Sequence, residues 1–243
     1  MYLKRKIDDF LADWKNSKEH KPLIIKGARQ IGKTESIKHF AKHYENFVNI
    51  NFALEKKFRT ICEDVYRVET IIKNISRIYP SKKFIAGKTL ILFDEIQDYP
   101  DIATSLKSFC MDGRFDVICS GSMLGINYHK IASNSVGYKS EFQMQSLDFE
   151  EFLWAKGYGT DLIDELLEHM KSGTPFSQTT MNVMNELFLD YCILGGMPKV
   201  VLTYVQRKSF EETLQLQQEL IADYKEDIKK YVEGIDKSKV LNV

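Results

Sequence analysis

The chain has 243 residues, of which 44% are hydrophobic, so it can bury one large core or two small ones. This composition excludes a disordered chain. The 34 basic residues balance the 34 acidic residues, and this neutrality does not support a broad nucleic-acid-binding or membrane-binding surface.

The sequence favours a cytoplasmic protein. Its first residues lack the apolar core and the small-residue cleavage site of a signal peptide. No run of about 18 apolar residues is present to span a membrane. The four cysteines show neither a C-x-x-C pair nor a metal-binding spacing, so we interpret them as buried, reduced thiols.

The first 150 residues alternate between helical and strand patterns. Apolar periodicity predicts helices at 3–15, at 33–44, in two pieces within 55–79, and at 101–111. Short apolar runs predict strands at 22–28, 47–52, 89–97, 115–122 and 141–147. This alternation predicts an α/β domain over residues 1–150, built on a parallel sheet with helices on both faces.

The pattern changes at Asp148, after which we expect only helices. No Gly or Pro interrupts the chain between Lys199 and Glu233, so we expect one long helix there. Its apolar stripe indicates packing in a core or against a partner helix. The second domain, over residues 151–243, is therefore predicted to be all-helical.

The strand at 22–28 runs into the pattern G-x-x-x-x-G-K-T, and a helix follows at once. Glycines let such a loop turn its N–H groups toward phosphate oxygens, and the first turn of the helix adds a positive dipole. We predict that Lys33 reaches the β- and γ-phosphates of a nucleotide and that Thr34 binds Mg²⁺. The predicted nucleotide-binding residues are Gly27, Ala28, Arg29, Gln30, Ile31, Gly32, Lys33, Thr34 and Glu35.

Two carboxylates end the apolar run "LILFDEIQ". Ligands of open α/β folds bind at the carboxyl ends of the strands, so we predict that Asp94 holds Mg²⁺ together with Thr34. Glu95 is placed to orient a water for attack on the γ-phosphate. The alternative interpretation is that this pair only ends a strand and caps the next turn.

A polar strand end, "VICSGS", supplies the last candidate for catalysis. We predict that Ser120 touches the γ-phosphate and the attacking water, with Ser122 as the second choice. Serines at strand ends also commonly bond to backbone in turns. The predicted catalytic residues are Glu95, Asp94, Lys33 and Ser120.

Two other features have simpler explanations. His39 and His43 lie four residues apart on a predicted helix, but no third metal ligand is evident, so we interpret them as surface or packing residues. The basic segment 81–88 is interpreted as a solvated turn, with contact to nucleic-acid phosphates as the alternative.

Five motifs occur in order, namely "GARQIGKT", "TLILFDEIQ", "CSGSMLG", "SLDFEEFLWA" and "YCILGGMPKVV". Together they resemble the prokaryotic AAA+-type P-loop ATPases whose second half is a domain of unknown function, and the resemblance runs from about Tyr2 to the last residue. It implies an AAA+ core followed by a helical lid, and a relation to the STAND-type switch ATPases. There, a glycine–proline turn of the lid packs on the nucleotide, which implies binding roles for Gly195, Gly196 and Pro198. The simpler alternative is that this glycine–proline segment is only a turn between two lid helices.

Two departures from the resemblance affect its partners. Relatives often carry G-R or G-K before the "DFEEFL" segment as a trans-acting cation, but here Gly137 is followed by Tyr138 and then Lys139. Lys139 and Arg114 are therefore the candidates for such a cation, while Arg29 at the loop tip is a candidate for contact with a neighbouring subunit. Relatives also continue into a domain that resembles restriction endonucleases, so 151–243 would hold the lid and the start of a linker. A second copy or such a domain is the expected partner, and nucleic acid is not supported by this chain.

The combined prediction is an ATP-binding, Mg²⁺-dependent ATPase whose hydrolysis is coupled to lid movement. The resemblance favours adenine, and no guanine-reading N/T-K-x-D motif is apparent. One alternative is a nucleotide-gated assembly switch with little turnover. A second is a small-molecule kinase. Such an enzyme usually has an arginine-rich lid, whereas the segment 160–198 contains Lys171 but no arginine. A DNA-associated component is a third, and it rests on fold-level analogy alone.

Overall fold

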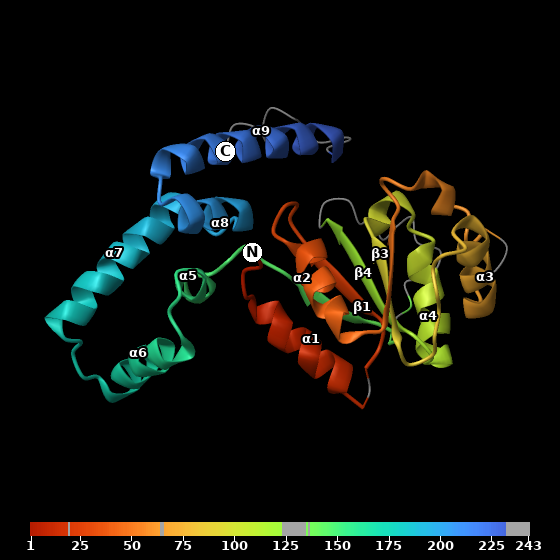
Figure 1. Ribbon diagram of the computed structural model, residues 1–243, viewed down its shortest axis with the longest axis horizontal. Coiled ribbons are helices and arrows are strands. Elements are labelled where there is room, and N and C mark those ends of the chain that lie inside the picture. The colour runs from red at the N-terminus through yellow and green to blue at the C-terminus, as the bar shows by residue number, and fades with distance from the viewer. Residues whose placement is uncertain (19, 64–65, 123–134, 136, 232–243) are drawn as a thin grey trace. The chain divides into compact units, whose positions relative to one another are not determined.

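The computed structural model describes residues 1–18, 20–63, 66–122, 135 and 137–231, with side chains described as far as residue 227 (Figure 1). The "MLG" of "CSGSMLG" and the last twelve residues of the chain lie outside this part. The chain divides into two compact units, one of Ile7–Gln145 and one of Met1–Lys6 with Ser146–Val243. The predicted domain boundary, with a nucleotide-binding core up to residue 150 and a helical lid after it, stays a prediction.

The first unit, which we call the α/β unit, contains a five-stranded sheet in which every pairing is parallel. The strand order is β2-β3-β4-β1-β5. The strands are β1 (Leu23–Gly27), β2 (Asn46–Asn51), β3 (Thr89–Asp94), β4 (Asp116–Ser122) and β5 (Ser140–Gln143). The predicted parallel sheet is thus confirmed. All five strands end at the same edge of the sheet, which we call the carboxyl edge.

Helices cover both faces of this sheet, with α1 and α2 on one side and α3 and α4 on the other (Figure 1). The helices are α1 (Lys6–Asn16), α2 (Lys33–Phe40), α3 (Val68–Ile78) and α4 (Ile102–Asp112), and the 3₁₀ turns are η1 (Ala41–His43), η2 (Lys56–Phe58) and η3 (Ile96–Asp98). Two expected helices are shorter than predicted. The helix expected at 33–44 ends at Phe40 and tightens into η1, and the first piece expected within 55–79 is only the turn η2.

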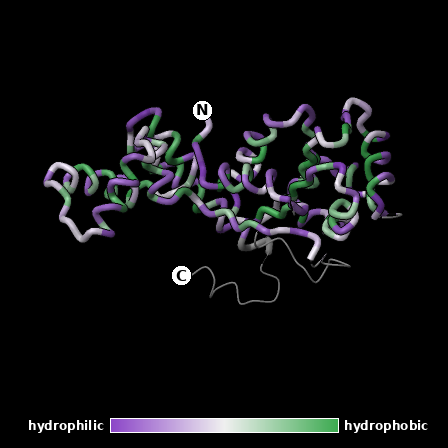
Figure 2. The backbone as a smooth tube through the Cα atoms, turned by 90° about the horizontal axis from the view of Figure 1, so that it is seen from below, coloured by the Kyte–Doolittle hydropathy of each residue, from purple (hydrophilic) through white to green (hydrophobic). Residues whose placement is uncertain are grey.

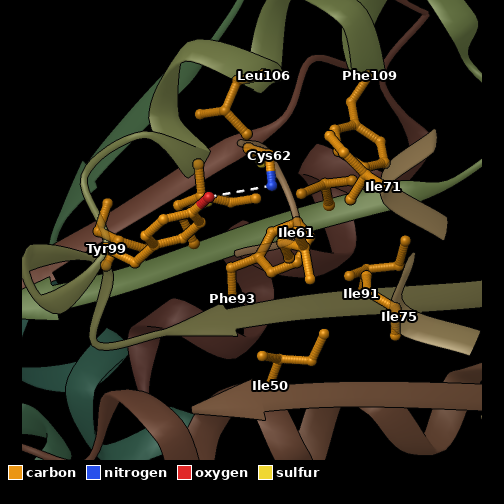
Figure 3. Close-up of a cluster of buried hydrophobic side chains, with 14 of the residues drawn as sticks. Ile50, Ile61, Cys62, Ile71, Ile75, Ile91, Phe93, Tyr99, Leu106 and Phe109 are labelled. Carbon is orange, nitrogen blue, oxygen red and sulfur yellow. Dashed lines mark hydrogen bonds between the residues drawn. The ribbon is translucent and has the colours of Figure 1, made fainter. Parts of the chain in front are cut away.

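The core between the sheet and α3 and α4 holds the central strand in place. All six residues of β3 are buried, and Figure 3 shows isoleucine, leucine and phenylalanine side chains gathered around it. Each fully buried side chain of this size contributes about 1.5–3 kcal/mol. Tyr99 belongs to the same cluster, and its hydroxyl oxygen accepts a 3.0 Å hydrogen bond from the N–H of Cys62. The turn that follows β3 is therefore anchored in the core.

The second unit, which we call the helical unit, contains α5 (Phe149–Ala155), α6 (Thr160–Ser172), α7 (Gln178–Leu194), α8 (Pro198–Arg207) and α9 (Phe210–Tyr231). The predicted helical character of this region is confirmed. Hydrophilic and hydrophobic residues alternate along the helices of both units (Figure 2). Among the described helices, none has the length and apolar character that a membrane span requires.

The single long helix expected after Lys199 is wrong, because the chain breaks between α8 and α9. Lys208 adopts a left-handed conformation with φ 54°, and its N–H bonds back to the carbonyl oxygen of Tyr204. The ring of Tyr204 then packs against Phe210 at 4.7 Å between centroids. Tertiary packing thus ends a helix that neither Gly nor Pro interrupts.

The first residues of the chain are held in the helical unit, which the sequence does not indicate. Leu3 joins its core. Arg5 and Glu151 are both buried and form an ion pair at 3.0 Å between Nε and Oε1. Glu151 also closes a capping box with Asp148 at the start of α5.

The expectation of buried cysteines holds for Cys62 and Cys119 only. Cys110 is partly buried, and Cys192 on α7 is exposed. All four are free thiols.

Candidate functional site

The loop between β1 and α2 has the backbone that the G-x-x-x-x-G-K-T pattern requires. Gly27 ends β1 against the side chain of Ile31 and the carbonyl oxygen of Met144, and these two leave no room for a Cβ atom. Gln30 and Gly32 take left-handed conformations with φ 62° and 94°. The loop then leads directly into the first turn of α2, where free N–H groups and the helix dipole favour an anion.

Lys33 folds back over this loop. Its side chain is buried, and Nζ donates to the carbonyl oxygens of Gly27 at 3.0 Å and Ala28 at 2.7 Å. Burial lowers the pKa of Lys33, the negative charges of Glu95 and Asp94 offset part of this effect, and the charge of Arg29 adds to it. The ammonium group of Lys33 therefore lies beside the loop, where it is bonded to carbonyl oxygens that a phosphate can replace.

Asp94 is the centre of the hydrogen-bond network at the carboxyl edge. Oδ2 accepts from Thr34 Oγ1 at 3.1 Å and from Asn51 Nδ2 at 3.2 Å. Oδ1 accepts from Ser120 Oγ and from the N–H of Glu95 at 3.1 Å. Four donors thus surround one buried carboxylate. The structure brings together the predicted residues Thr34, Asp94 and Ser120 from three separate parts of the chain.

Ser120 is completely buried, and its hydroxyl group donates to Asp94. In this arrangement Ser120 can influence a nucleotide through Asp94. Its predicted contact with a γ-phosphate stays a prediction. Ser122, the second choice, is also buried, and its N–H contacts the Oε1 atom of Gln97 at 3.4 Å.

Glu95 leaves β3 in a left-handed conformation with φ 57°. This conformation turns the chain into η3 and keeps the side chain partly exposed at the carboxyl edge. Glu95 Oε2 accepts from Nε2 of Gln97. The two acids of the "DE" pair therefore lie in different surroundings. Asp94 is buried among four donors, whereas the hydrogen bond described for the Glu95 side chain comes from Gln97 of its own turn.

Sequence reasoning missed two residues of this network, Asn51 and Gln97. Asn51 is the last residue of β2 and pairs in register with Asp94 on β3. A polar residue at the end of an apolar strand was the available signal, but it did not reveal which strand lies beside β3. Gln97 lies within "LFDEIQ", and only the turn of η3 brings its side chain back to Glu95.

The other predicted loop residues differ in exposure. Ala28, Gln30 and Glu35 are exposed, Ile31 is buried, and Arg29 is partly buried. The side chain of Glu35 pairs with Lys38 at 2.8 Å on the surface of α2. Their predicted contacts with a nucleotide stay predictions.

Gly196 and Pro198 belong to the helical unit, where both have structural roles. Pro198 is the first residue of α8, a position that suits its fixed φ angle. The carbonyl oxygen of Gly196 accepts a 2.8 Å bond from the N–H of Leu147, and the main-chain oxygen of Leu147 would collide with a Cβ at Gly196. Gly195 takes a positive φ of 67° at the end of α7.

The two candidate trans-acting cations lie at the opposite edge of the sheet. Arg114 precedes β4 and pairs with Asp112 and Glu69. Lys139 precedes β5 and pairs with Glu141 at 2.7 Å. Because the sheet is parallel, the start of each strand is far from the carboxyl edge of the same chain. Neither cation therefore serves this chain's own loop. Within the described residues, no group of three or more His, Cys, Asp or Glu side chains could hold a metal ion.

The sequence matches models of two known domain families. A model of the AAA domain family matches residues 19–153, more than half of the chain, and a domain of unknown function matches residues 185–243. No curated protein matches the sequence.

Two solved structures show the extent of the structural likeness. The Walker-type ATPase PABY2304 of Pyrococcus abyssi is 15% identical with a TM-score of 0.53, covering 94% of this chain and 76% of that chain. PCH-2 of C. elegans is 12% identical with a TM-score of 0.36, covering 72% of this chain and 49% of that chain. The first likeness supports the fold, whereas the second is too distant to carry an argument.

Proposed function

The chain belongs to the AAA domain family, and from this premise we propose that it is an ATP-binding, Mg²⁺-dependent ATPase module. One observation carries the proposal. Thr34, on the first turn after the phosphate-type loop, donates directly to Asp94, at the end of the "DE" strand β3, although β4 lies between β1 and β3. The hydroxyl and the carboxylate that such a site needs are thus already side by side.

Lys33 and the loop N–H groups bind the phosphates in this proposal. Lys33 would exchange the carbonyl oxygens of Gly27 and Ala28 for phosphate oxygens. This exchange is favourable, because a phosphate oxygen carries the negative charge that a carbonyl oxygen lacks, so both partners of the new hydrogen bonds are ionised.

Thr34 and Asp94 fit Mg²⁺, because this ion prefers hydroxyl and carboxylate oxygens and keeps several waters. When bound, the ion neutralises charge on the phosphates. The residues around it keep Asp94 in place: Asn51 and Ser120 hold one carboxylate oxygen each. We assign Ser120 to this positioning role, in addition to the sensing role expected from the sequence.

Glu95 orients the attacking water in this scheme. Its carboxylate is less buried than that of Asp94, and the hydrogen bond described for it comes from Gln97 of its own turn. The nucleotide contacts of Gly196 and Pro198, and the movement of the helical unit as a lid, belong to the same proposal. They follow from the family resemblance alone.

A nucleotide-gated assembly switch with little turnover is the second candidate, and the position of the cations makes assembly relevant to both candidates. Arg114 and Lys139 lie at the amino edge of the sheet and cannot complete the site of their own chain. A cation supplied by another copy or domain is worth about 10³–10⁵ in rate in related chemistry. We therefore expect slow turnover by the isolated chain and faster turnover if copies assemble.

The test is binding of Mg-ATP by calorimetry, followed by steady-state hydrolysis. Losing a hydrogen bond to a charged group costs about 1.5–3 kcal/mol, so Lys33→Ala should weaken ATP binding about 10- to 150-fold. Lys42→Ala, an exposed lysine just after α2, is the matched control and should leave binding unchanged. Glu95→Gln should bind ATP normally but hydrolyse it poorly.

The outcomes separate the two candidates. Binding with no turnover at any protein concentration would support the switch. If neither ATP nor any other nucleotide binds in magnesium buffer, both candidates are wrong.

A further inference from the structure

Gln97 makes two contacts that the proposed chemistry does not explain. Its Nε2 group donates to Glu95 Oε2, and its Oε1 atom accepts from the N–H of Ser122 at 3.4 Å. One carboxamide thus links the turn after β3 to the last residue of β4. Ser122 lies two positions after Ser120, which holds Asp94 from the same strand.

The partners of Gln97 determine the orientation of its amide group. The carboxylate of Glu95 can only accept when it is charged, and the N–H of Ser122 can only donate. Rotating the amide by half a turn would oppose oxygen to oxygen and N–H to N–H. A glutamine satisfies both partners in one orientation, whereas a glutamate or a methionine at this position cannot.

The backbone of this turn is fixed independently of the Gln97 side chain. The N–H of Glu95 donates to Asp94 at 3.1 Å, and the N–H of Asp98 donates to the carbonyl oxygen of Glu95 at 3.0 Å. Ile96 and Tyr99 on either side of Gln97 are buried. A left-handed residue such as Glu95 costs about 1–3 kcal/mol and persists only where its surroundings impose it. What remains free to vary is the direction of the Glu95 side chain.

We propose that Gln97 is a positioning residue that sets the direction of the Glu95 carboxylate and ties this direction to the end of β4. The inference rests on the proposed function, in which Glu95 orients the attacking water. Both acids are then aligned to one strand, Asp94 through Ser120 and Glu95 through Gln97 and Ser122. A displacement at the end of β4 would therefore move both acidic groups together.

The kinetic consequence is a loss of turnover without a loss of binding. Gln97 does not reach Lys33 or Thr34 by any contact described for it, so the phosphates and Mg²⁺ keep their ligands. A misplacement of about 1 Å in a reacting group can lower a rate about 100-fold. We expect Gln97→Met and Gln97→Glu to lower kcat about 10- to 100-fold while KM changes less than about threefold.

The turnover rates of the two variants should differ in a way that a purely structural role of Gln97 would not produce. Methionine keeps the length of the side chain and removes the donor, whereas glutamate keeps its shape and places a second carboxylate beside Glu95. Gln97→Glu should therefore be slower than Gln97→Met, even if the two unfold at the same urea concentration. Gln218→Met, on the exposed face of α9, is the matched control and should hydrolyse ATP as the natural chain does.

A double-mutant cycle completes the test. Because Gln97 acts through Glu95, adding Gln97→Met to Glu95→Gln should lower kcat no further. Unchanged kcat in both Gln97 variants, or a loss that adds fully to that of Glu95→Gln, would overturn the inference and leave the ATPase proposal intact. A natural chain that binds Mg-ATP but never hydrolyses it would overturn the ATPase proposal, and the positioning role with it.

Discussion

Replacing Asp94 by asparagine tests the central network of the site. The carboxylate accepts four hydrogen bonds, from Thr34, Asn51, Ser120 and the N–H of Glu95. Asparagine has nearly the same shape, but only one of its two end atoms can accept. Whichever way its amide turns, an NH₂ group must face two of these donors.

Either orientation leaves one donor that cannot become an acceptor, either the NH₂ group of Asn51 or the N–H of Glu95. If the new NH₂ group replaces Oδ2, the hydroxyl of Thr34 can rotate and accept, but the NH₂ group of Asn51 cannot. Asn51 also cannot turn its amide, because its oxygen already accepts the N–H groups of Ala53 and Leu54, each at 3.0 Å. One half-buried donor is then left without a partner, which costs about 1–3 kcal/mol. The loss of charge assistance in the remaining bonds adds about 1 kcal/mol, so Asp94→Asn should lower the free energy of unfolding by about 2–4 kcal/mol.

Urea unfolding in the absence and presence of Mg-ATP measures this effect and its functional counterpart. A ligand at 100 times its dissociation constant stabilises the natural chain by about 2.7 kcal/mol. Asp94→Asn should lose most of this gain in magnesium and bind ATP as the natural chain does in EDTA. Asp98→Asn removes only a partly exposed pair with Arg59 and is the control, with an expected change of about 0–1 kcal/mol. If Asp94→Asn unfolds like the natural chain, the four-donor network is wrong, and if it keeps the magnesium-dependent gain, Asp94 is not a metal ligand.

Two further substitutions test the structure away from Asp94. Gly196→Ala would place a Cβ against the main-chain oxygen of Leu147, and overpacking of this kind costs about 1–3 kcal/mol. The urea midpoint of this variant should therefore fall, and an unchanged midpoint would contradict the close approach. Burial tends to raise the pKa of Glu141, but hydrogen bonds from Lys139 and Lys26 outweigh this effect and lower the pKa below its ordinary value. The charged carboxylate therefore stabilises the fold at neutral pH, and this stabilisation is lost as the pH falls through the lowered pKa. The unfolding free energy of Glu141→Gln should therefore vary less between about pH 5 and pH 3 than that of the natural chain, and equal slopes would rule out this contribution.

The sheet could be predicted from the sequence because its strands are short and almost entirely apolar. β3 is buried at every position, and a run such as "TLILF" has few other uses in a chain of this size. The loop was equally predictable, because Gly27 and Gly32 occupy positions where packing or a positive φ leaves few alternatives. In both places local chemistry and tertiary structure favour the same conformation.

The rest could not be read from the sequence, because it depends on contacts between distant residues. The break at Lys208 follows from the packing of α8 and α9, and no local signal marks it. The place of Asn51 depends on β2 lying next to β3, which is a property of strand order. The pairing of Arg5 with Glu151 joins residues 146 positions apart, and two oppositely charged residues in a sequence rich in both charges do not indicate their partner.

The strand order explains why the two acids of the site should respond differently to substitution. β3 lies between β2 and β4, and β1 follows β4, so Asp94 at the end of β3 receives one donor from each neighbouring strand and one from the helix that follows β1. Its carboxylate links four segments and must contribute to stability. Glu95, one residue later, has left the sheet, and its side chain contacts Gln97 of the same turn. Removing this carboxylate should lower the free energy of unfolding little, because the described residues give it one side-chain hydrogen bond, and it should lower turnover strongly. Separate measurement of unfolding and turnover in Asp94→Asn and Glu95→Gln distinguishes these two roles, and equal destabilisation by both would show that the network does not follow the strand order.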